Sequence, residues 1–123
     1  MKILIIDDEQ VLLDLYRDVL VEKGHNVLTA RRGEDGIKIA MQEQPELILL
    51  DILMPDMNGF DVAEHLKSQD VTKNIPIYLL TNLPEESSDE KAKQLGVAGY
   101  LMKAMTEPGE LAKIIADFEK KSK

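Results

Sequence analysis

The chain has 123 residues, no cysteine and a formal net charge of −8, with an isoelectric point of about 4.7. Its length suits one domain around a single core, and the lack of cysteine excludes disulfides, thiolate chemistry and cysteine-based metal sites. The acidic balance argues against nucleic acid or an anionic membrane as a direct partner, and favours a protein or a cation.

The first half of the chain alternates short apolar runs with helical patterns. The predicted strands are 3–6, a weaker one within 25–30, and 47–50. The first helical pattern stops at Gly24, and a second helix opens at Gly33 with Ile37, Ala40 and Met41 on its apolar face. No apolar run approaches the length of a membrane span, so we expect a cytoplasmic protein.

The second half repeats the alternation, with predicted strands at 77–80 and 99–102. Asn58 is the expected N-cap of the third helix, and the spacing of Ser87 and Glu90 predicts a capping box for a fourth helix that Gly96 closes. A final helix carries the apolar stripe Leu111, Ile114, Ile115 and Phe118, and the basic end 120–123 is expected to be frayed and solvated. Five strands alternating with five helices predict an α/β fold, a doubly wound parallel sheet with helices on both faces.

Polar residues gather at the predicted carboxyl ends of these strands, which meet in one crevice of a doubly wound sheet. Asp7 and Asp8 follow the first strand and Asp51 ends the third. Three carboxylates this close repel one another unless a cation lies among them, and oxygen ligands without histidine or cysteine suit Mg²⁺. Thr81 and Lys103 supply donors for an anion beside the metal. The set predicts a phosphoryl-transfer site with Asp51 as nucleophile and an aspartyl phosphate as product.

These motifs resemble the receiver domain of bacterial response regulators, the second component of two-component signalling. The matching residues are Asp7-Asp8, Asp51, Met54-Pro55, Asn58-Gly59, Thr81 and Gly99-Tyr100-Leu101-Met102-Lys103. The resemblance covers essentially the whole chain and is closest to single-domain, chemotaxis-regulator-like members. It implies the flavodoxin-like receiver fold with strand order 2-1-3-4-5, one domain over residues 1–123, and no output domain.

The resemblance also implies a division of roles at the acidic site. Asp51 is expected to accept a phosphoryl group from a phosphohistidine on a sensor histidine kinase or a histidine phosphotransfer protein. Asp8 and Asp51 would ligate Mg²⁺ directly, with the backbone carbonyl of Leu53 as a third ligand, while Asp7 would act through a metal-bound water. The protein would then catalyse only its own phosphorylation and dephosphorylation, and would not be an enzyme in the usual sense.

The remaining roles concern the output of the switch. Thr81 and Lys103 would contact the phosphoryl oxygens, and Thr81 would move toward them as Tyr100 turns from exposed to buried. That motion would remodel the face formed by the fourth helix, fifth strand and fifth helix, which would bind a downstream protein target. The protein would be a monomer or a phosphorylation-linked dimer. Tyr100 as an ordinary half-buried strand aromatic stays an open alternative.

Two positions depart from the family pattern. The family usually has proline after the lysine, with a cis bond before it, whereas Ala104 follows Lys103 here. A cis bond before a non-proline residue costs about 2.5–4 kcal/mol, so the bond is either trans with a rearranged loop or a strained cis bond, and we favour trans. Asn82 stands where the family prefers a small residue, usually alanine. Its side chain would either narrow the access of the donor histidine to Asp51 or form a hydrogen bond near the phosphate. Leu53 and Leu83 occupy variable positions that in the family influence how fast the phosphate is lost. Two apolar side chains there should disfavour water, which predicts a long-lived aspartyl phosphate.

Other functions on the same architecture fit the sequence less well. A flavodoxin needs a hydroxyl-rich loop after the first strand, where Asp7-Asp8-Glu9 would repel the flavin phosphate. A haloacid-dehalogenase-type phosphatase needs an acid two residues after its nucleophile, where Leu53 stands. A pseudo-receiver that keeps the fold without being phosphorylated stays open because of Asn82 and Ala104.

Overall fold

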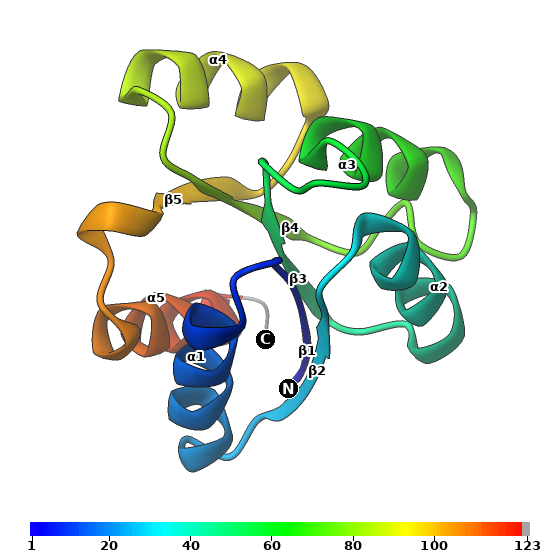
Figure 1. Ribbon diagram of the computed structural model, residues 1–123. Helices are drawn as coiled ribbons and strands as arrows, with labels where there is room; N and C mark the ends of the chain where they lie inside the picture. The colour runs from blue at the N-terminus through cyan, green and yellow to red at the C-terminus, as the bar shows by residue number, and fades with distance from the viewer. Residues whose placement is uncertain (122–123) are drawn as a thin grey trace.

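The structure is a computed structural model that describes residues 1–121 as a five-stranded parallel sheet with helices on both faces (Figure 1). The strands are β1 (Lys2–Ile6), β2 (Asn26–Ala30), β3 (Leu47–Asp51), β4 (Ile77–Thr81) and β5 (Gly99–Met102). The helices are α1 (Gln10–Glu22), α2 (Gly33–Glu43), α3 (Gly59–Ser68), α4 (Glu85–Leu95), the 3₁₀ turn η1 (Lys103–Met105) and α5 (Pro108–Lys121). The strand order β2-β1-β3-β4-β5 confirms the predicted fold.

Successive residues of the central strands face two separate cores, which explains their continuous apolar runs. Leu4 and Ile48 belong to the core beneath α2 and α3. Their chain neighbours Ile3 and Leu47 belong to the core beneath α1 and α5. All four side chains are fully buried, so the centre of the sheet is a rigid base for whatever its ends carry.

The carboxyl ends of the strands form one edge of the sheet. Asp51 is the last residue of β3 and pairs with Leu80 of β4, while Thr81 ends β4 opposite Met102 of β5. Asp7 directly follows β1, and its N–H still donates to the carbonyl of Ala30 on β2 at 3.0 Å. The parallel ladder therefore brings the predicted site residues to the same edge.

Several local expectations are confirmed at helix ends. The Asn58 side chain accepts a hydrogen bond from the Phe60 N–H at 2.8 Å and caps α3, as predicted. Gly24 and Gly96 follow α1 and α4 with φ of +92° and +67°, the left-handed conformation that suits glycine at a helix end. The stripe on α5 lies in the core as expected.

Other expectations are wrong. Met41 is 38% exposed, and Gly36 instead faces the core, where its missing Cβ leaves room for Ile6. The capping box at Ser87 does not form, because α4 begins two residues earlier, at Glu85, after Pro84. Ser87 thus lies within the first turn of the helix.

The chain end also differs from the expectation. Helix α5 continues through Lys121, so residues 120 and 121 are helical instead of frayed, although both are exposed. The expectation for residues 122 and 123 lies outside the described residues. Within residues 1–121, the structure has no helix with the length and apolarity that crossing a membrane requires.

Candidate functional site

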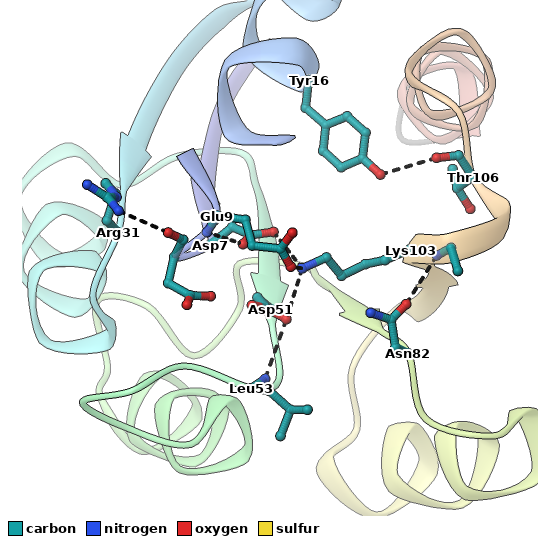
Figure 2. A network of polar contacts seen from close by, with 11 residues as sticks. Asp7, Glu9, Tyr16, Arg31, Asp51, Leu53, Asn82, Lys103 and Thr106 are labelled. Carbon is teal, nitrogen blue, oxygen red and sulfur yellow. Dashed lines mark hydrogen bonds and ion pairs between the residues drawn. The ribbon is translucent and has the colours of Figure 1, made fainter. Parts of the chain in front are cut away.

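The carboxylates of Asp7, Asp8 and Asp51 form a cluster at the carboxyl edge of the sheet. Figure 2 labels two of them, Asp7 and Asp51. Asp7 is completely buried, Asp51 is 4% exposed, and Asp8 is partly exposed. One oxygen from each of the three lies within 4.8 Å of the others. Because β1 and β3 are neighbours in the sheet, the residues at their ends place these oxygens side by side. The three acids predicted to meet at this edge therefore do so.

Lys103 reaches into the cluster from the other side of the site, as Figure 2 shows. Its ammonium lies 3.1 Å from Oδ2 of Asp7, 3.5 Å from Oδ1 of Asp51 and 2.8 Å from Oε1 of Glu9. The lysine side chain is only 5% exposed. Burial opposes its charge, but the hydrogen bond to Glu9 and the charges of the two aspartates outweigh that effect and raise the pKa of Lys103. The side chain therefore stays an ammonium.

The environment of the two buried acids, Asp7 and Asp51, disfavours their ionised forms. Burial, with a further contribution from the charge of Asp7, raises the pKa of Asp51 from its ordinary 3.8 to about 7, although Lys103 acts in the opposite direction. Burial also raises the pKa of Asp7. One ammonium therefore does not offset the carboxylates around it, and an additional positive charge would favour their ionised forms.

The residues present fit a hard divalent cation. Oδ1 of Asp7 accepts the Glu9 N–H at 2.9 Å, whereas its buried Oδ2 has the Lys103 ammonium as its partner at 3.1 Å. Oδ1 of Asp51 accepts the N–H of Leu53 at 3.4 Å, which holds the backbone of Leu53 beside the cluster. A donor set made only of oxygens, whose negative charge one ammonium does not offset, suits Mg²⁺.

Thr81 is buried at the end of β4, but its hydroxyl is engaged with the segment that leads into α4. Its Oγ1 accepts the Leu83 N–H at 2.9 Å and lies 3.4 Å from Oγ of Ser88, which donates to it. Ser88 is fully buried and was not singled out from the sequence. The only signal for it is the four-residue spacing to Ala92, the other buried residue of α4.

Tyr100 is half-buried on β5 and faces the same helix. The carboxylate of Asp89 on α4 accepts a hydrogen bond from its hydroxyl, and this bond raises the pKa of Tyr100 to about 12, with smaller contributions from burial and from Glu85. The phenol thus stays protonated and joins β5 to α4. Thr81 and Tyr100 therefore share one neighbour, which links the two predicted switch residues through α4.

The two positions that depart from the family pattern contact each other. No peptide bond within residues 1–121 is cis, which confirms a trans bond between Lys103 and Ala104. The Ala104 N–H donates to Oδ1 of Asn82 at 3.1 Å (Figure 2). Of the two roles predicted for Asn82, hydrogen bonding is present, and its partner is the backbone that follows Lys103.

Two supporting residues were missed in the sequence. Glu9 was noticed only as part of an acidic run, yet it forms the shortest contact to Lys103. Asp56 lies in the loop after β3 and caps α2, accepting the N–H groups of Gly33 and Glu34 at 3.1 and 3.3 Å. Burial alone would raise the pKa of Asp56, but these bonds outweigh it and lower the pKa. The capping contact of Asp56 joins segments that are far apart in the chain, so no spacing between nearby residues predicts it.

Comparisons with known proteins agree with this geometry. Residues 3–116 match the family described as response regulator receiver domain. Protein PilH of Pseudomonas aeruginosa is 36% identical over 106 residues, 86% of this chain and 88% of PilH. The polar-differentiation response regulator DivK of Brucella anthropi is 28% identical over 106 residues, 86% of each protein.

The structural comparison gives the same result. The chemotaxis protein CheY4 of Vibrio cholerae has a TM-score of 0.87 and 28% sequence identity, covering 94% of this chain and 96% of CheY4. The family match spans most of the chain, and the fold and the acidic cluster agree with it. The chain therefore belongs to the response regulator receiver domain family, the phosphoacceptor modules of two-component signalling.

Proposed function

We propose that Asp51 is the residue that accepts the phosphoryl group. The observation that carries this proposal is the placement of its carboxylate, with one oxygen within 4.8 Å of an oxygen of each of the other two acids and Oδ1 3.5 Å from the ammonium of Lys103. The end of β3 gives it a fixed position, and its exposed fraction of 4% leaves a narrow approach from the edge of the sheet. An oriented carboxylate beside a buried cation is a suitable nucleophile for phosphoryl transfer.

Mg²⁺ is the cofactor we propose. Asp8 and Asp51 would bind it directly with the backbone carbonyl of Leu53, and Asp7 would hold a water bound to it. The oxygen-only cluster, whose negative charge the Lys103 ammonium alone does not offset, supports this assignment. When bound, the cation neutralises charge on the carboxylates and on the incoming phosphoryl group.

The donor in this proposal is a phosphohistidine of a sensor kinase or a phosphotransfer protein. An oxygen of Asp51 attacks phosphorus, an O–P bond forms and the N–P bond breaks. The electron pair of that bond returns to the imidazole, which takes up a proton from water. Lys103 would hold one phosphoryl oxygen, for which its position 3.5 Å from Oδ1 of Asp51 is suitable. Thr81 would hold another after leaving its present partners.

The output in this proposal is a change at the face formed by α4, β5 and α5, which would bind a downstream protein or a second copy of the chain. The hydroxyl of Thr81 now accepts hydrogen bonds at the start of α4, and Tyr100 is bonded to Asp89 of that helix. The Thr81 O–H is free to donate to a phosphoryl oxygen, but drawing the side chain toward Asp51 would break the two contacts in which its oxygen accepts, so the two positions of the side chain would compete. Such competition gives phosphate a different affinity for two arrangements, which a switch requires.

The aspartyl phosphate is expected to be long-lived. Leu53 follows Asp51 at the rim of the site with 64% exposure, and Leu83 is half-buried near Thr81. Neither side chain can orient a water molecule for attack on phosphorus. We expect a half-life of many minutes, measured by loss of the added mass after the donor is removed, and a half-life of seconds would contradict this.

The experiment that tests the proposal follows the intact mass of the protein during incubation with acetyl phosphate, with and without Mg²⁺. We expect a gain of one phosphoryl group that requires Mg²⁺, is absent in Asp51→Asn, and is retained in Asp117→Asn, an exposed aspartate on α5. If neither acetyl phosphate nor a phosphorylated histidine protein labels the wild type, the proposal fails, and the chain is a pseudo-receiver.

A further inference from the structure

Thr81 ends β4 and Lys103 follows β5, and these are the two side chains proposed to hold the phosphoryl oxygens. One hydrogen bond joins the segments that follow the two strands. Thr81 pairs with Met102 in the β4–β5 ladder, so Asn82 and Lys103 are the first residues beyond it. The amide oxygen of Asn82 accepts the Ala104 N–H at 3.1 Å (Figure 2). The contact extends the pairing of β4 and β5 beyond the last ladder pair, with a side-chain oxygen as acceptor in place of a backbone carbonyl.

The bond acts directly on the backbone of Lys103. The nitrogen of Ala104 belongs to the same planar peptide group as the carbonyl of Lys103, so fixing this N–H fixes the orientation of that group. The Ala104 N–H is also one of the first in the three-residue turn η1, where an N–H has no partner within the turn itself. Asn82 thus supplies from a neighbouring loop the acceptor that η1 lacks.

The position of the Lys103 ammonium depends on this backbone. It lies between 2.8 and 3.5 Å from three carboxylates on segments that follow β1 and β3. The base of its side chain is in η1, which is short and contains no buried residue. The Lys103 side chain itself is only 5% exposed, but the other two residues of the turn, Ala104 and Met105, are exposed. The hydrogen bond from Asn82 therefore holds a part of the backbone that packing does not cover.

We propose that Asn82 is a positioning residue for Lys103. It holds the peptide group between Lys103 and Ala104 and so places the ammonium where a phosphoryl oxygen arrives. The inference rests on the proposed function, in which Lys103 contacts the phosphoryl group. It also gives Asn82 a role opposite to that of a steric barrier: removing its amide slows phosphorylation by a small donor, whereas removing a barrier would speed it.

The test compares Asn82→Ala with Asn74→Ala, the same change at an exposed asparagine in the turn before β4. Three quantities are measured for each variant and the wild type: the rate constant of labelling by acetyl phosphate with saturating Mg²⁺, the Kd for Mg²⁺, and the ¹⁵N chemical shift of the Lys103 ammonium without donor. Urea unfolding midpoints show whether a change in global stability explains any difference.

We expect Asn82→Ala to label about three- to tenfold more slowly than the wild type, the effect of one lost hydrogen bond on a transition state. Its Lys103 resonance should shift, while its Kd for Mg²⁺ and its unfolding midpoint stay close to the wild-type values. Asn74→Ala should match the wild type in every measurement. Equal or faster labelling of Asn82→Ala overturns the inference.

The inference and the proposed function fail separately. If neither acetyl phosphate nor a phosphorylated histidine protein labels the wild type, the proposed function is wrong, and the inference is then decided by the Lys103 resonance alone. A shift in Asn82→Ala that is absent in Asn74→Ala supports the positioning role. An unchanged Lys103 resonance in Asn82→Ala overturns it.

Discussion

The two halves of the site are built on different foundations. The acidic half consists of Asp7, which follows β1, and Asp51, which ends β3, and both strands are buried on both faces of the sheet. The switch half, Thr81 and Tyr100, lies on β4 and β5 against α4, the helix with the most polar sequence of the five. The carboxylates therefore lie at the ends of two packed strands, whereas the proposed switch residues contact a polar helix through hydrogen bonds.

Helices α3 and α4 show the same contrast. Helix α3 buries Gly59, Val62, Ala63 and Leu66, whereas α4 buries only Ser88 and Ala92. A segment with few buried apolar contacts opens at lower free energy than a packed one. The molecule thus combines a preformed cluster of carboxylates with a neighbouring helix that few apolar contacts hold, an arrangement that suits the proposed phosphate-driven switch.

The largest effect is expected from breaking the charge balance of the acidic half. Lys103→Met leaves Asp7 and Asp51 buried without their ammonium partner, and breaking a buried ion pair costs about 3 kcal/mol of unfolding free energy. Urea unfolding near neutral pH without Mg²⁺ measures this loss, and added Mg²⁺ should restore part of it. Lys38→Met, at an exposed pair with Glu34, should change stability by less than about 0.5 kcal/mol. Equal effects of the two changes would contradict the contrast between the halves.

A smaller loss is expected from crowding the loop behind Asp51. A Cβ at Gly59 would overlap the carbonyl oxygen of Asp51 and lie 2.6 Å from Cα of Ile52, both backbone atoms that cannot turn aside. We expect Gly59→Ala to lower the unfolding free energy by about 2–3 kcal/mol. A Cβ at Gly109 meets no atom within 4 Å, so Gly109→Ala should be neutral or slightly stabilising. A neutral Gly59→Ala would show that the acidic half is less rigid than described.

The pH dependence of the unfolding free energy tests the acidic half through the charge of Asp51. Because the folded protein raises the pKa of Asp51 from 3.8 to about 7, it binds this proton more tightly than the unfolded chain. Without Mg²⁺, the carboxyl therefore costs the native state stability as pH rises between those two values. Asp51→Asn removes the cost and should be more stable than the wild type by about 2 kcal/mol near pH 8, with little difference near pH 4. A pH-independent difference would contradict this.

The smallest effect is expected in the switch half. Ser88→Ala removes the 3.4 Å contact to Thr81 but leaves the backbone donor of Leu83 in place. We expect a loss below about 1 kcal/mol, together with faster amide hydrogen exchange confined to α4. Ser87→Ala, at an exposed neighbour, should leave exchange unchanged. Faster exchange throughout the sheet would show that α4 is not an independent, weakly held element.

Much of the fold could be predicted because the pattern was local. Each buried strand appeared as a continuous apolar run, and the residue types after each run indicated which edge carries the chemistry. Gly36 shows where this reasoning fails. The apolar pattern placed Met41 on the buried face of the helix and did not include Gly36, because a residue without a side chain does not contribute to an apolar pattern. Only the structure shows that Ile6 occupies that space.

The supporting contacts of the site could not be predicted, because they join residues far apart in the chain. Asp56 caps a helix 22 and 23 residues earlier, and Asn82 holds a backbone N–H 22 residues later. Neither contact follows a helical or strand period. Asn82 and Ala104 could be recognised in the sequence as departures from the family, but their contact depends on the register of β4 and β5.

The most direct test of the account identifies the modified residue itself. The protein labelled in the presence of Mg²⁺ is reduced with borohydride, which converts an aspartyl phosphate to homoserine, and its peptides are sequenced by mass spectrometry. We expect homoserine at position 51 alone, with aspartate retained at positions 7 and 8. Homoserine at either of those positions, or a phosphoryl group on a serine, threonine or histidine, would contradict the assignment of Asp51 as the phosphoacceptor.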